Sequence, residues 1–370
     1  MNKAKKIIIS VTNDLVADQR VHKVAQSLVK NNFDVLVVGR KLPNSQELKR
    51  QSYETKRMKL LFTKTAFFYA EYNLRLFFFL IFRKADIFLA NDLDTLAANY
   101  FASILKKTKL VYDSHEYFTE VPELKNRKSV RKIWLSIEKF IVPKIKHSYT
   151  VCQSLAKIFS EKYGINMQII KNYPICEKTN IQNSNKKIDI PEGKKVVLYQ
   201  GSLNVDRGLE SMIKAMQFIE NAVLLIIGDG DISLQLKQLT KNLKLDEKVK
   251  FIGKIPYYHL PAYTKIASIG VSLEENTNLN YQYALPNKIF DYIQAGVPVL
   301  ASSLAEIDLI YKKYNIGLQI KSHEPEHIAA SILKMLDSND LRKIWKNDLI
   351  KAAKEFCWEK QEIELLKIFL

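Results

Sequence analysis

Residues 284–301, ALPNKIFDYIQAGVPVLA, predict a short helix that runs into a buried strand at 297–301. Pro286 presets the backbone for a first helical turn, and Gly296 can take the left-handed conformation with which helices often end. At helical spacing the large apolar residues share one face of this helix, namely Ile289, Phe290, Tyr292 and Ile293. The apolar face predicts that the helix packs on a sheet.

The other face of the predicted helix carries polar or small residues, namely Asn287, Lys288, Asp291, Gln294 and Ala295. Free N–H groups at a helix N-terminus and a nearby ammonium group both attract phosphate. The turn at Pro286 therefore predicts an anion site that faces a cleft. Asp291 lies one turn further along and can accept hydrogen bonds from a ribose diol. An ordinary amphipathic helix with a solvated polar face is the alternative interpretation.

The chain has 370 residues, of which 47% are hydrophobic. That length exceeds one comfortable hydrophobic core, so two domains are expected. The N-terminal sequence MNKAKKIIISVTND contains an apolar run that is too short for a signal peptide, and it predicts a first strand. The longest uninterrupted apolar run, residues 76–82, is too short to cross a bilayer. No transmembrane segment is expected.

Only three cysteines occur, Cys152, Cys176 and Cys357, and their spacing matches no metal-binding pattern. Scattered cysteines in small number are typical of a protein in a reducing cytosol without a disulfide framework. The sequence therefore predicts a cytoplasmic protein with no metal site.

The formal net charge of +18 predicts an anionic partner, which is a nucleic acid, a lipid surface or a phosphorylated small molecule. No zinc-finger, RNP or basic-zipper pattern occurs, so a nucleic-acid partner is not expected. Residues 56–84 and 125–146 combine basic side chains with large apolar ones, which suits a protein that rests on an anionic membrane surface. Helices that pack on a sheet and expose solvated outer faces explain the two stretches equally well.

The first half of the chain reads as strand, helix and strand at 6–11, 20–31 and 34–39, and further short strands follow at 86–90, 110–113 and 149–151. Such crossovers imply a parallel, doubly wound sheet, although the first turn lacks the glycines of a dinucleotide-binding fingerprint. In such folds the functional residues follow the carboxyl ends of strands. The polar residues at these positions are Asp18, Arg20, Asn91, Asp92, Asp113, Ser114, His115 and Glu116.

Two of these positions allow a more specific interpretation. Asp92, Leu93 and Asp94 imitate a metal-binding DxD triplet, but Asp94 is better explained as the cap of a helix that begins at Thr95. His115 lies between two acids directly after a buried strand, so it is a candidate functional residue, with a structural role as the alternative.

The strand–helix pattern begins again after a polar, proline-containing linker. Strands at 196–199 and 223–227 end at Gly201-Ser202 and at Gly228. We therefore predict an N-terminal α/β domain at 1–171, a linker at 172–193 and a C-terminal α/β domain at 194–350. A last helix at 351–370 can pack back on the first domain. Two doubly wound domains in tandem are expected to face a central cleft.

The ordered segments YQGSLNVDRGLESMIKAM, LLIIGDG, FIGKIP and LPNKIFDYIQAGVPVLA resemble the retaining family-four glycosyltransferases of the GT-B fold. In the first half, DQRVHKVAQSLVKNNFDVLVV, DIFLANDLD and YDSHE resemble bacterial members that build surface polysaccharides such as lipopolysaccharide or capsule. The resemblance spans nearly the whole chain.

The resemblance implies that the second domain holds a nucleotide-diphosphate sugar. Arg207 matches the basic residue that contacts the diphosphate, whereas Ser202 replaces a second basic position. Asp291 matches the later of two acids, which holds the ribose, and Tyr283 occupies the position of the earlier acid. The expected donor-binding residues are Gly201, Ser202, Arg207, Gly228, Pro286, Asn287, Lys288 and Asp291. His115 corresponds to the histidine beside the transferred sugar, and the expected acceptor-side residues are Asp18, Arg20, Asp92 and Glu116.

The implied reaction is the retaining transfer of a hexose to a lipid-linked or growing polysaccharide acceptor, by a peripheral protein on the inner face of the cell membrane. Arg207, Lys288 and the helix N-terminus would stabilise the departing diphosphate, so neither a metal nor a cofactor is expected. Two alternatives remain open at this point. A nucleotide-sugar 2-epimerase shares the architecture but needs acids and bases set for proton abstraction, for which His115 and Glu116 are the candidates. A non-catalytic, membrane-associated relative is favoured by the acid missing at Tyr283.

Overall fold

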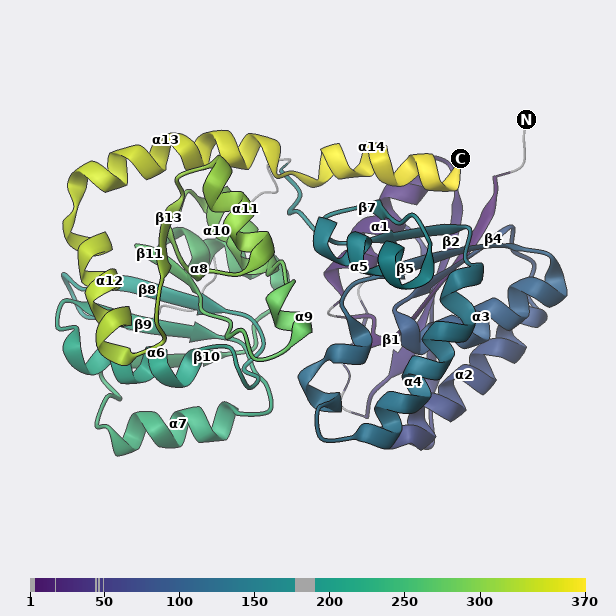
Figure 1. Cartoon of the computed structure of the whole chain (residues 1–370), viewed down its shortest axis with the longest axis horizontal. Helices are drawn as coiled ribbons and strands as arrows, with labels where there is room; N and C mark the ends of the chain where they lie inside the picture. The colour runs from purple at the N-terminus through teal and green to yellow at the C-terminus, as the bar shows by residue number, and fades with distance from the viewer. Residues whose placement is uncertain (1–3, 17, 44, 46, 49, 177–189) are drawn as a thin grey trace. The chain divides into compact units, whose positions relative to one another are not determined.

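The computed structural model describes residues 4–16, 18–43, 45, 47–48, 50–176 and 190–370 (Figure 1). The chain forms two compact units. Unit 1 comprises Met1–Asn172 together with Gln361–Leu370, and unit 2 comprises Tyr173–Lys360. Most of the predicted linker at 172–193, namely 177–189, lies outside the described residues.

Unit 1 is built on a parallel sheet with the strand order β3-β2-β1-β4-β5-β6-β7. The strands are β1 Lys6–Asp14, β2 Asp34–Lys41, β3 Glu54–Lys59, β4 Ile87–Asn91, β5 Lys109–Ser114, β6 His147–Thr150 and β7 Gln168–Ile169. The sequence analysis did not predict β3, because this edge strand, ETKRMK, is mostly exposed and lacks the apolar alternation of a half-buried strand.

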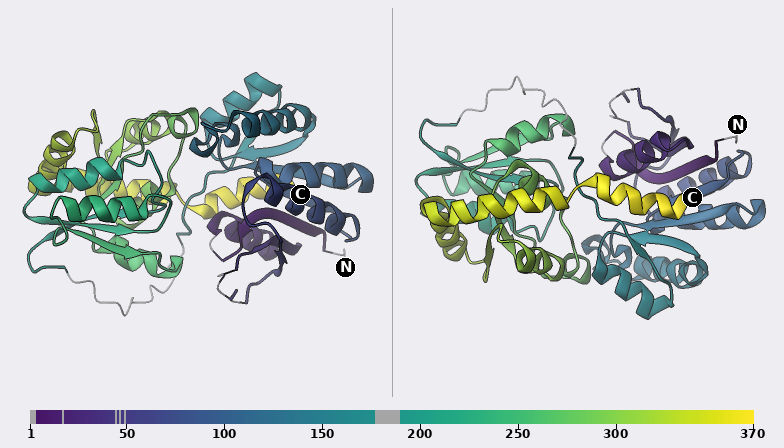
Figure 2. Two further views of the ribbon diagram at one scale, coloured as in Figure 1. Left: turned by 90° about the horizontal axis from the view of Figure 1, so that it is seen from below. Right: turned by 90° about the horizontal axis from the view of Figure 1, so that it is seen from above.

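The helices of unit 1 connect these parallel strands. They are α1 Gln19–Lys30, α2 Thr65–Ile81, α3 Leu93–Lys106, α4 Lys128–Ile141 and α5 Gln153–Tyr163. Helices α2 and α3 lie side by side, as both views of Figure 2 show, and α3 also contacts α4. Tyr69 of α2 packs its ring edge-on against Trp134 of α4. The three helices therefore form one layer.

The end of helix α14 (Trp358–Phe369) completes unit 1. The ring of Phe369 packs 6.5 Å from that of Phe33, and Lys109 donates a 2.7 Å hydrogen bond to the carbonyl of Ile368. The last ten residues of the chain thus cover part of the core made by the first strands.

Unit 2 repeats the doubly wound pattern with the strand order β10-β9-β8-β11-β12-β13. The strands are β8 Lys195–Gln200, β9 Ala222–Ile227, β10 Val249–Gly253, β11 Ile269–Ser272, β12 Val299–Ser302 and β13 Gly317–Ile320. The helices are α6 Leu209–Ala215, α7 Ser233–Asn242, α8 Leu260–Lys265, α9 Leu279–Gln282, α10 Asn287–Ala295, α11 Ala305–Lys313, α12 Pro325–Asp337 and α13 Asn339–Glu355. The predicted architecture of two doubly wound α/β domains is confirmed.

Helix α10 has the predicted bounds. Pro286 precedes its first turn, and Gly296 ends it with φ 70°. The four large apolar residues of the helix are buried as predicted. The following strand begins two residues later than predicted, at Val299.

Two glycines bring the loops after β8 and β9 into contact. Gly228 has φ 146°, and a Cβ atom there would lie 1.8 Å from the carbonyl oxygen of Gly201. Only a residue without a side chain fits this approach. The strand ends of β8 and β9 are therefore held together where the donor site is predicted.

We expect Gly228→Ala to lower the free energy of unfolding by about 3 kcal/mol or more, because the added methyl group overlaps the Gly201 backbone. Gly296→Ala is the matched control, since it has a positive φ but open space around it, and should cost about 1 kcal/mol. Urea unfolding measures both values. Equal destabilisation by the two changes would contradict the proposed role of close backbone approach.

Candidate active site

The predicted donor residues gather in unit 2 at the carboxyl ends of β8 and β11, the two neighbouring strands at which the strand order reverses. Ligands of doubly wound sheets bind at such a switch point. Gln200 ends β8 and is followed by the Gly201 loop, while Leu273 and Glu274 follow β11. Helix α10 starts beside them, with Lys288 next to Gly201.

A buried carboxylate, Glu274, holds this site together. It has no exposed surface, and it accepts hydrogen bonds from Lys288 Nζ at 2.5 Å and from Ser272 Oγ at 2.7 Å. Arg207 Nη1 lies 3.4 Å from the same oxygen that Lys288 contacts. Burial raises the pKa of Glu274, but Lys288 and Arg207 outweigh burial and bring the pKa down to about 2. Glu274 is therefore a carboxylate at neutral pH.

The sequence analysis missed Glu274 and misplaced Lys288. Lys288 was expected on a cleft-facing polar surface, yet its side chain is only 6% exposed, and its ammonium lies 4.4 Å from the centre of the Tyr199 ring. Burial and Arg207 lower the pKa of Lys288, and Glu274 opposes both effects. The buried acid near the two cations is thus Glu274, while Tyr283 ends the short helix α9. Glu274 directly follows β11, and this position was the signal by which the sequence analysis could have found it.

Two cations share one carboxylate, so the cluster carries a surplus positive charge. Arg207 exposes 25% of its side chain and lies over the Tyr281 ring. Its Nε is buried and, within the described residues, has no hydrogen-bond partner. A buried unpaired donor is costly, so Arg207 is set to receive an anionic oxygen.

Asp291 lies one turn beyond Lys288 on α10 and is oriented by Gln200. The amide of Gln200 donates to Asp291 Oδ2 at 2.9 Å, and its oxygen accepts from Thr264 at 2.9 Å. Tyr257, 42% exposed, lies close enough that Asp291 adds to the effect of burial in raising the Tyr257 pKa. The sequence analysis missed both Gln200 and Tyr257.

The remaining predicted donor residues frame this cluster. Asn287 is exposed at the first position of α10, and Pro286 provides no side-chain cap. Ser202 is exposed, and its carbonyl accepts a hydrogen bond from Tyr199 at 2.6 Å. The structure therefore brings together all eight predicted donor-side residues in one part of unit 2.

Two of the residues predicted for the acceptor side, Arg20 and Asp92, lie in a chain of alternating charges at the ends of β4 and β5. His115 Nε2 lies 2.8 Å from Asp113 Oδ2, and His115 Nδ1 lies 3.1 Å from Asp92 Oδ2. Arg20 is 4% exposed and contacts both oxygens of Asp113, at 2.9 and 2.8 Å. Asp92 adopts φ 56°, which is rare for a residue other than glycine and is often found at functional sites.

The two carboxylates set the charge of His115. Burial lowers the pKa of His115, but Asp113 and Asp92 outweigh it and raise the pKa well above its usual value. The ring is therefore an imidazolium at neutral pH, and both of its nitrogens already face carboxylates. His115 exposes 19% of its side chain. It cannot act as a general base in this state.

Three residues of unit 1 that were predicted for the acceptor side make hydrogen bonds that stabilise the fold. Asp18 caps α1 by accepting from the Val21 amide at 3.1 Å, and Arg20 donates to the carbonyl of Ile170 at 2.9 Å. Glu116 is partly buried, and its carbonyl accepts from Ser114 Oγ.

The predicted helix cap at Asp94 is wrong, because α3 begins at Leu93 and Asp94 lies inside it. Asp94 instead accepts a 2.5 Å hydrogen bond from Thr12, and burial together with Asp92 raises its pKa to about 8. Asp92 and Asp94 thus contact different partners. Among the described residues they do not form a metal-binding group.

Comparisons with known proteins agree with this geometry. Residues 17–172 match the family model Glycosyltransferase Family 4, and residues 180–355 match the model Glycosyl transferases group 1. The chain is a glycosyltransferase with the GT-B fold.

Two relatives illustrate the similarity in sequence. This glycosyltransferase is 27% identical over 289 residues to the uncharacterized glycosyltransferase MJ1069 of Methanocaldococcus jannaschii, covering 75% of this chain and 72% of the relative. It is 28% identical over 148 residues to the lipopolysaccharide core biosynthesis glycosyltransferase LpsD of Rhizobium meliloti, covering 40% of this chain and 41% of that relative.

Solved structures share the fold over nearly the whole chain. Sucrose-phosphate synthase from Thermosynechococcus elongatus superposes with a TM-score of 0.80 at 15% identity, covering 99% of this chain and 98% of the other. The Anabaena protein HepE, in complex with UDP-glucose, gives a TM-score of 0.73 at 13% identity and covers 98% and 99%.

We expect the stability of unit 1 to fall as pH rises above neutral. The pKa of His115 is raised in the folded protein. The stability that its imidazolium contributes is therefore complete below the pKa of an unfolded histidine, about 6.5, and is lost as pH rises through the folded pKa. Melting temperatures across pH 6 to 10 should decline more steeply for the wild type than for His115→Gln.

His147→Gln provides the control within unit 1, because burial and nearby lysines lower the pKa of His147 instead of raising it. This variant should keep the steep decline of the wild type. Parallel melting curves for the wild type and His115→Gln would show that His115 is not charged in the folded protein.

Proposed function

We propose that this glycosyltransferase moves a hexose, with retention of configuration, from a nucleoside diphosphate sugar to a lipid-linked or growing polysaccharide acceptor. The observation that carries the proposal is the Arg207–Glu274–Lys288 cluster, whose surplus positive charge lies at the sheet switch point. The UDP-glucose complex of HepE and the name of LpsD support the choice of donor and acceptor classes.

The cluster provides the electrostatic part of the reaction. As the bond between the anomeric carbon and the phosphate oxygen breaks, negative charge builds on the diphosphate. Arg207, whose Nε has no partner among the described residues, and the start of α10 supply fixed positive potential there. Glu274 keeps both cations in place. The acceptor oxygen bonds to the anomeric carbon on the face the diphosphate leaves, and a phosphate oxygen takes the acceptor proton.

The nucleoside is placed by Asp291 and its neighbours. Because Gln200 fixes one carboxylate oxygen of Asp291, the orientation of Asp291 is set before the ribose diol arrives. The exposed ring of Tyr257 lies near Asp291 and offers a flat surface for a nucleobase.

His115 serves as a positioning residue in this proposal. Its imidazolium fixes Asp92, which follows β4, and Asp113, which lies near the end of β5. The same protonation argues against the 2-epimerase alternative, since proton abstraction needs an unprotonated base. Tyr283 stands where an acid was expected, and this favoured a non-catalytic relative. Glu274 weakens that case, because it supplies an acid beside the two cations.

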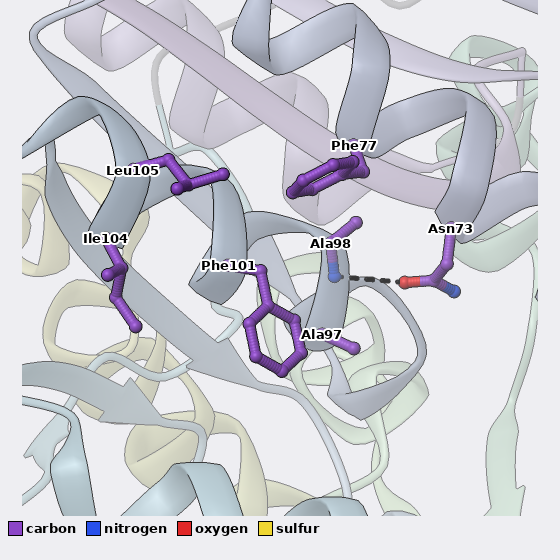
Figure 3. Close-up of a pocket in the computed structure, with 7 residues that line it drawn as sticks. All are labelled: Asn73, Phe77, Ala97, Ala98, Phe101, Ile104 and Leu105. Atoms are coloured by element: carbon purple, nitrogen blue, oxygen red, sulfur yellow. Dashed lines mark hydrogen bonds between the residues drawn. The ribbon is translucent and has the colours of Figure 1, made fainter.

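The acceptor side is proposed to meet an anionic membrane surface through the layer of α2, α3 and α4. This layer exposes large apolar side chains, namely Leu74, Phe78, Phe82, Phe101, Ile104, Leu105, Ile133 and Phe140. Between α2 and α3 lies an open groove of about 400 Å³, shown in Figure 3 and lined by Asn73, Phe77, Ala97, Ala98, Phe101, Ile104 and Leu105. Exposed lysines of α4 accompany this apolar surface.

Apolar groups and lysines on one helical layer are the combination that binds the interface of an anionic bilayer. No helix of the described chain is long and apolar enough to span a membrane.

We expect Arg207→Ala to lower turnover roughly 30- to 1,000-fold, the effect of losing about 2–4 kcal/mol of transition-state stabilisation. Release of nucleoside diphosphate from a panel of nucleotide sugars, with and without a lipid-linked acceptor, measures it. Lys241→Ala removes an exposed cation of the same unit and should leave turnover unchanged. Wild-type turnover in Arg207→Ala would refute the proposed donor site.

Lys288→Met is expected to lower the free energy of unfolding of unit 2 by about 3–5 kcal/mol, because it leaves Glu274 buried without its nearest cation. Adding Glu274→Gln should restore much of the stability in urea unfolding but not the turnover. Recovery of turnover by the double variant would exclude Lys288 from the reaction.

We expect the full chain to bind vesicles with anionic lipids and to leave them as salt rises, since each basic side chain at the surface adds about 1 kcal/mol. Lys128, Lys132 and Lys139 are exposed on α4, whereas Arg131 pairs with Glu120 and is best left intact. Changing the three lysines to Ser should weaken co-sedimentation.

The matched control changes three exposed lysines of unit 2, Lys237, Lys241 and Lys346, to Ser. The two variants lose the same charge, so a specific membrane face predicts weaker binding for the α4 variant alone. Equal binding by both, or no binding by the wild type at low salt, would remove the membrane from the proposal.

A further inference from the structure

Two of the three cysteines come together in unit 2 although they are far apart in the sequence. Cys176 Sγ, Cys357 Sγ and a carboxylate oxygen of Glu359 all lie within 4.8 Å of one another. In the part of the chain that the structure describes, no other group of three or more His, Cys, Asp or Glu side chains is arranged in this way. Cys176 and Cys357 are thus scattered in the sequence but close in the fold, because linear spacing does not show which segments the fold brings together.

The surrounding contacts hold these three side chains in place. The amide of Cys176 donates to both carboxylate oxygens of Glu359, at 2.9 and 3.2 Å. Gln294 Nε2 lies 3.1 Å from Cys176 Sγ, and it is anchored by the carbonyls of Ala353 at 2.8 Å and Phe356 at 3.0 Å. The cluster is thus tied to α10, to the end of α13 and to the start of α14.

We propose that Cys176, Cys357 and Glu359 bind a thiophilic divalent cation of the zinc class. Ligand atoms at a tetrahedral zinc ion lie about 3.5–3.8 Å apart, given bond lengths of about 2.3 Å to sulfur and about 2.1 Å to oxygen, so only a small adjustment is needed. Thiolate ligands favour zinc over magnesium or calcium, which prefer all-oxygen sites. Cys176 is exposed, which gives the ion an entry path, whereas Cys357 is buried.

The charges of this cluster also suit a cation. A divalent ion displaces the thiol protons and offsets the repulsion among the thiolates and the carboxylate.

The location suggests a structural role, distinct from the donor site. The chain passes from unit 1 to unit 2 after Asn172 and returns after Lys360. Cys176 follows the first crossing closely, and Cys357 and Glu359 directly precede the second. A bound ion would tie the two crossing segments to each other within unit 2.

The test uses the full chain, fully reduced and freed of metal by a chelator. Titration with Co²⁺ should produce a thiolate-to-cobalt charge-transfer band that saturates at one equivalent of Co²⁺. Zn²⁺ should then displace the Co²⁺ and remove the band. Cys176→Ser and Cys357→Ser should lose the band, and Glu359→Gln should keep a weaker band with affinity reduced about 10-fold or more. Cys152→Ser is the control, because Cys152 precedes α5 in unit 1 and Ser suits a helix N-cap.

A second measurement separates binding from folding. Zn²⁺ should raise the melting temperature of the wild type and of Cys152→Ser, but not of Cys176→Ser or Cys357→Ser. The proposal would be overturned if the reduced wild type gave no band or if all variants gave an equal band. It would also be overturned if Cys176 and Cys357 formed a disulfide under oxidised glutathione while the reduced pair took up no metal. None of these readouts depends on glycosyl transfer, so the outcome is independent of the proposed function.

Discussion

The burial of one carboxylate between two cations is the constraint on which the proposed donor site depends. Glu274 has no contact with solvent, so it persists as an anion only because Lys288 and Arg207 lie beside it. In turn, Glu274 fixes where the two cations sit, below the Gly201 loop and over the rings of Tyr199 and Tyr281. The surplus charge is therefore preorganised before any ligand arrives, which is the condition under which electrostatics lowers a reaction barrier most.

Unit 1 applies the same arrangement at its own strand ends. Asp113, fully buried near the end of β5, lies between Arg20 and His115, and its pKa falls to about 2 because these cations outweigh its burial. Asp92 extends the chain of charges and also accepts from the His115 amide at 2.7 Å. In both units a buried acid orders the side chains at the sheet edge where doubly wound folds bind their ligands.

The sequence was sufficient to predict the fold because its signals are local. The apolar spacing of α10 and the β-branched runs of β1 and β9 each specify an element, and their alternation specifies parallel sheets. The polar edge strand β3 escaped prediction because it has no apolar face to reveal it.

The site was predicted in part, for a related reason. Several residues after strand ends were found, although Glu274 after β11 was missed. The pairing of Lys288 with Glu274 and the proximity of Cys176 and Cys357 depend on contacts between segments that the sequence does not show to be neighbours. Periodicity also placed Lys288 on the polar side of α10, but it does not show that Lys288 is buried there against the carboxylate of Glu274, which follows β11. Likewise, Asp18 and Arg20 were recognised as important, but the cap and the buried ion pair that explain them became visible only in three dimensions.

Helix α14 gives the chain an order of assembly. It begins at Trp358 in unit 2 and ends in unit 1, where Phe369 packs against Phe33. Residues 361–370 are synthesised after the whole of unit 2, so the sheet of unit 1 waits for helix α14 before its core is fully covered. A fragment that stops at Asn172 would leave that part of the core open to water. Unit 1 is thus one compact domain whose residues do not form one continuous segment of the sequence.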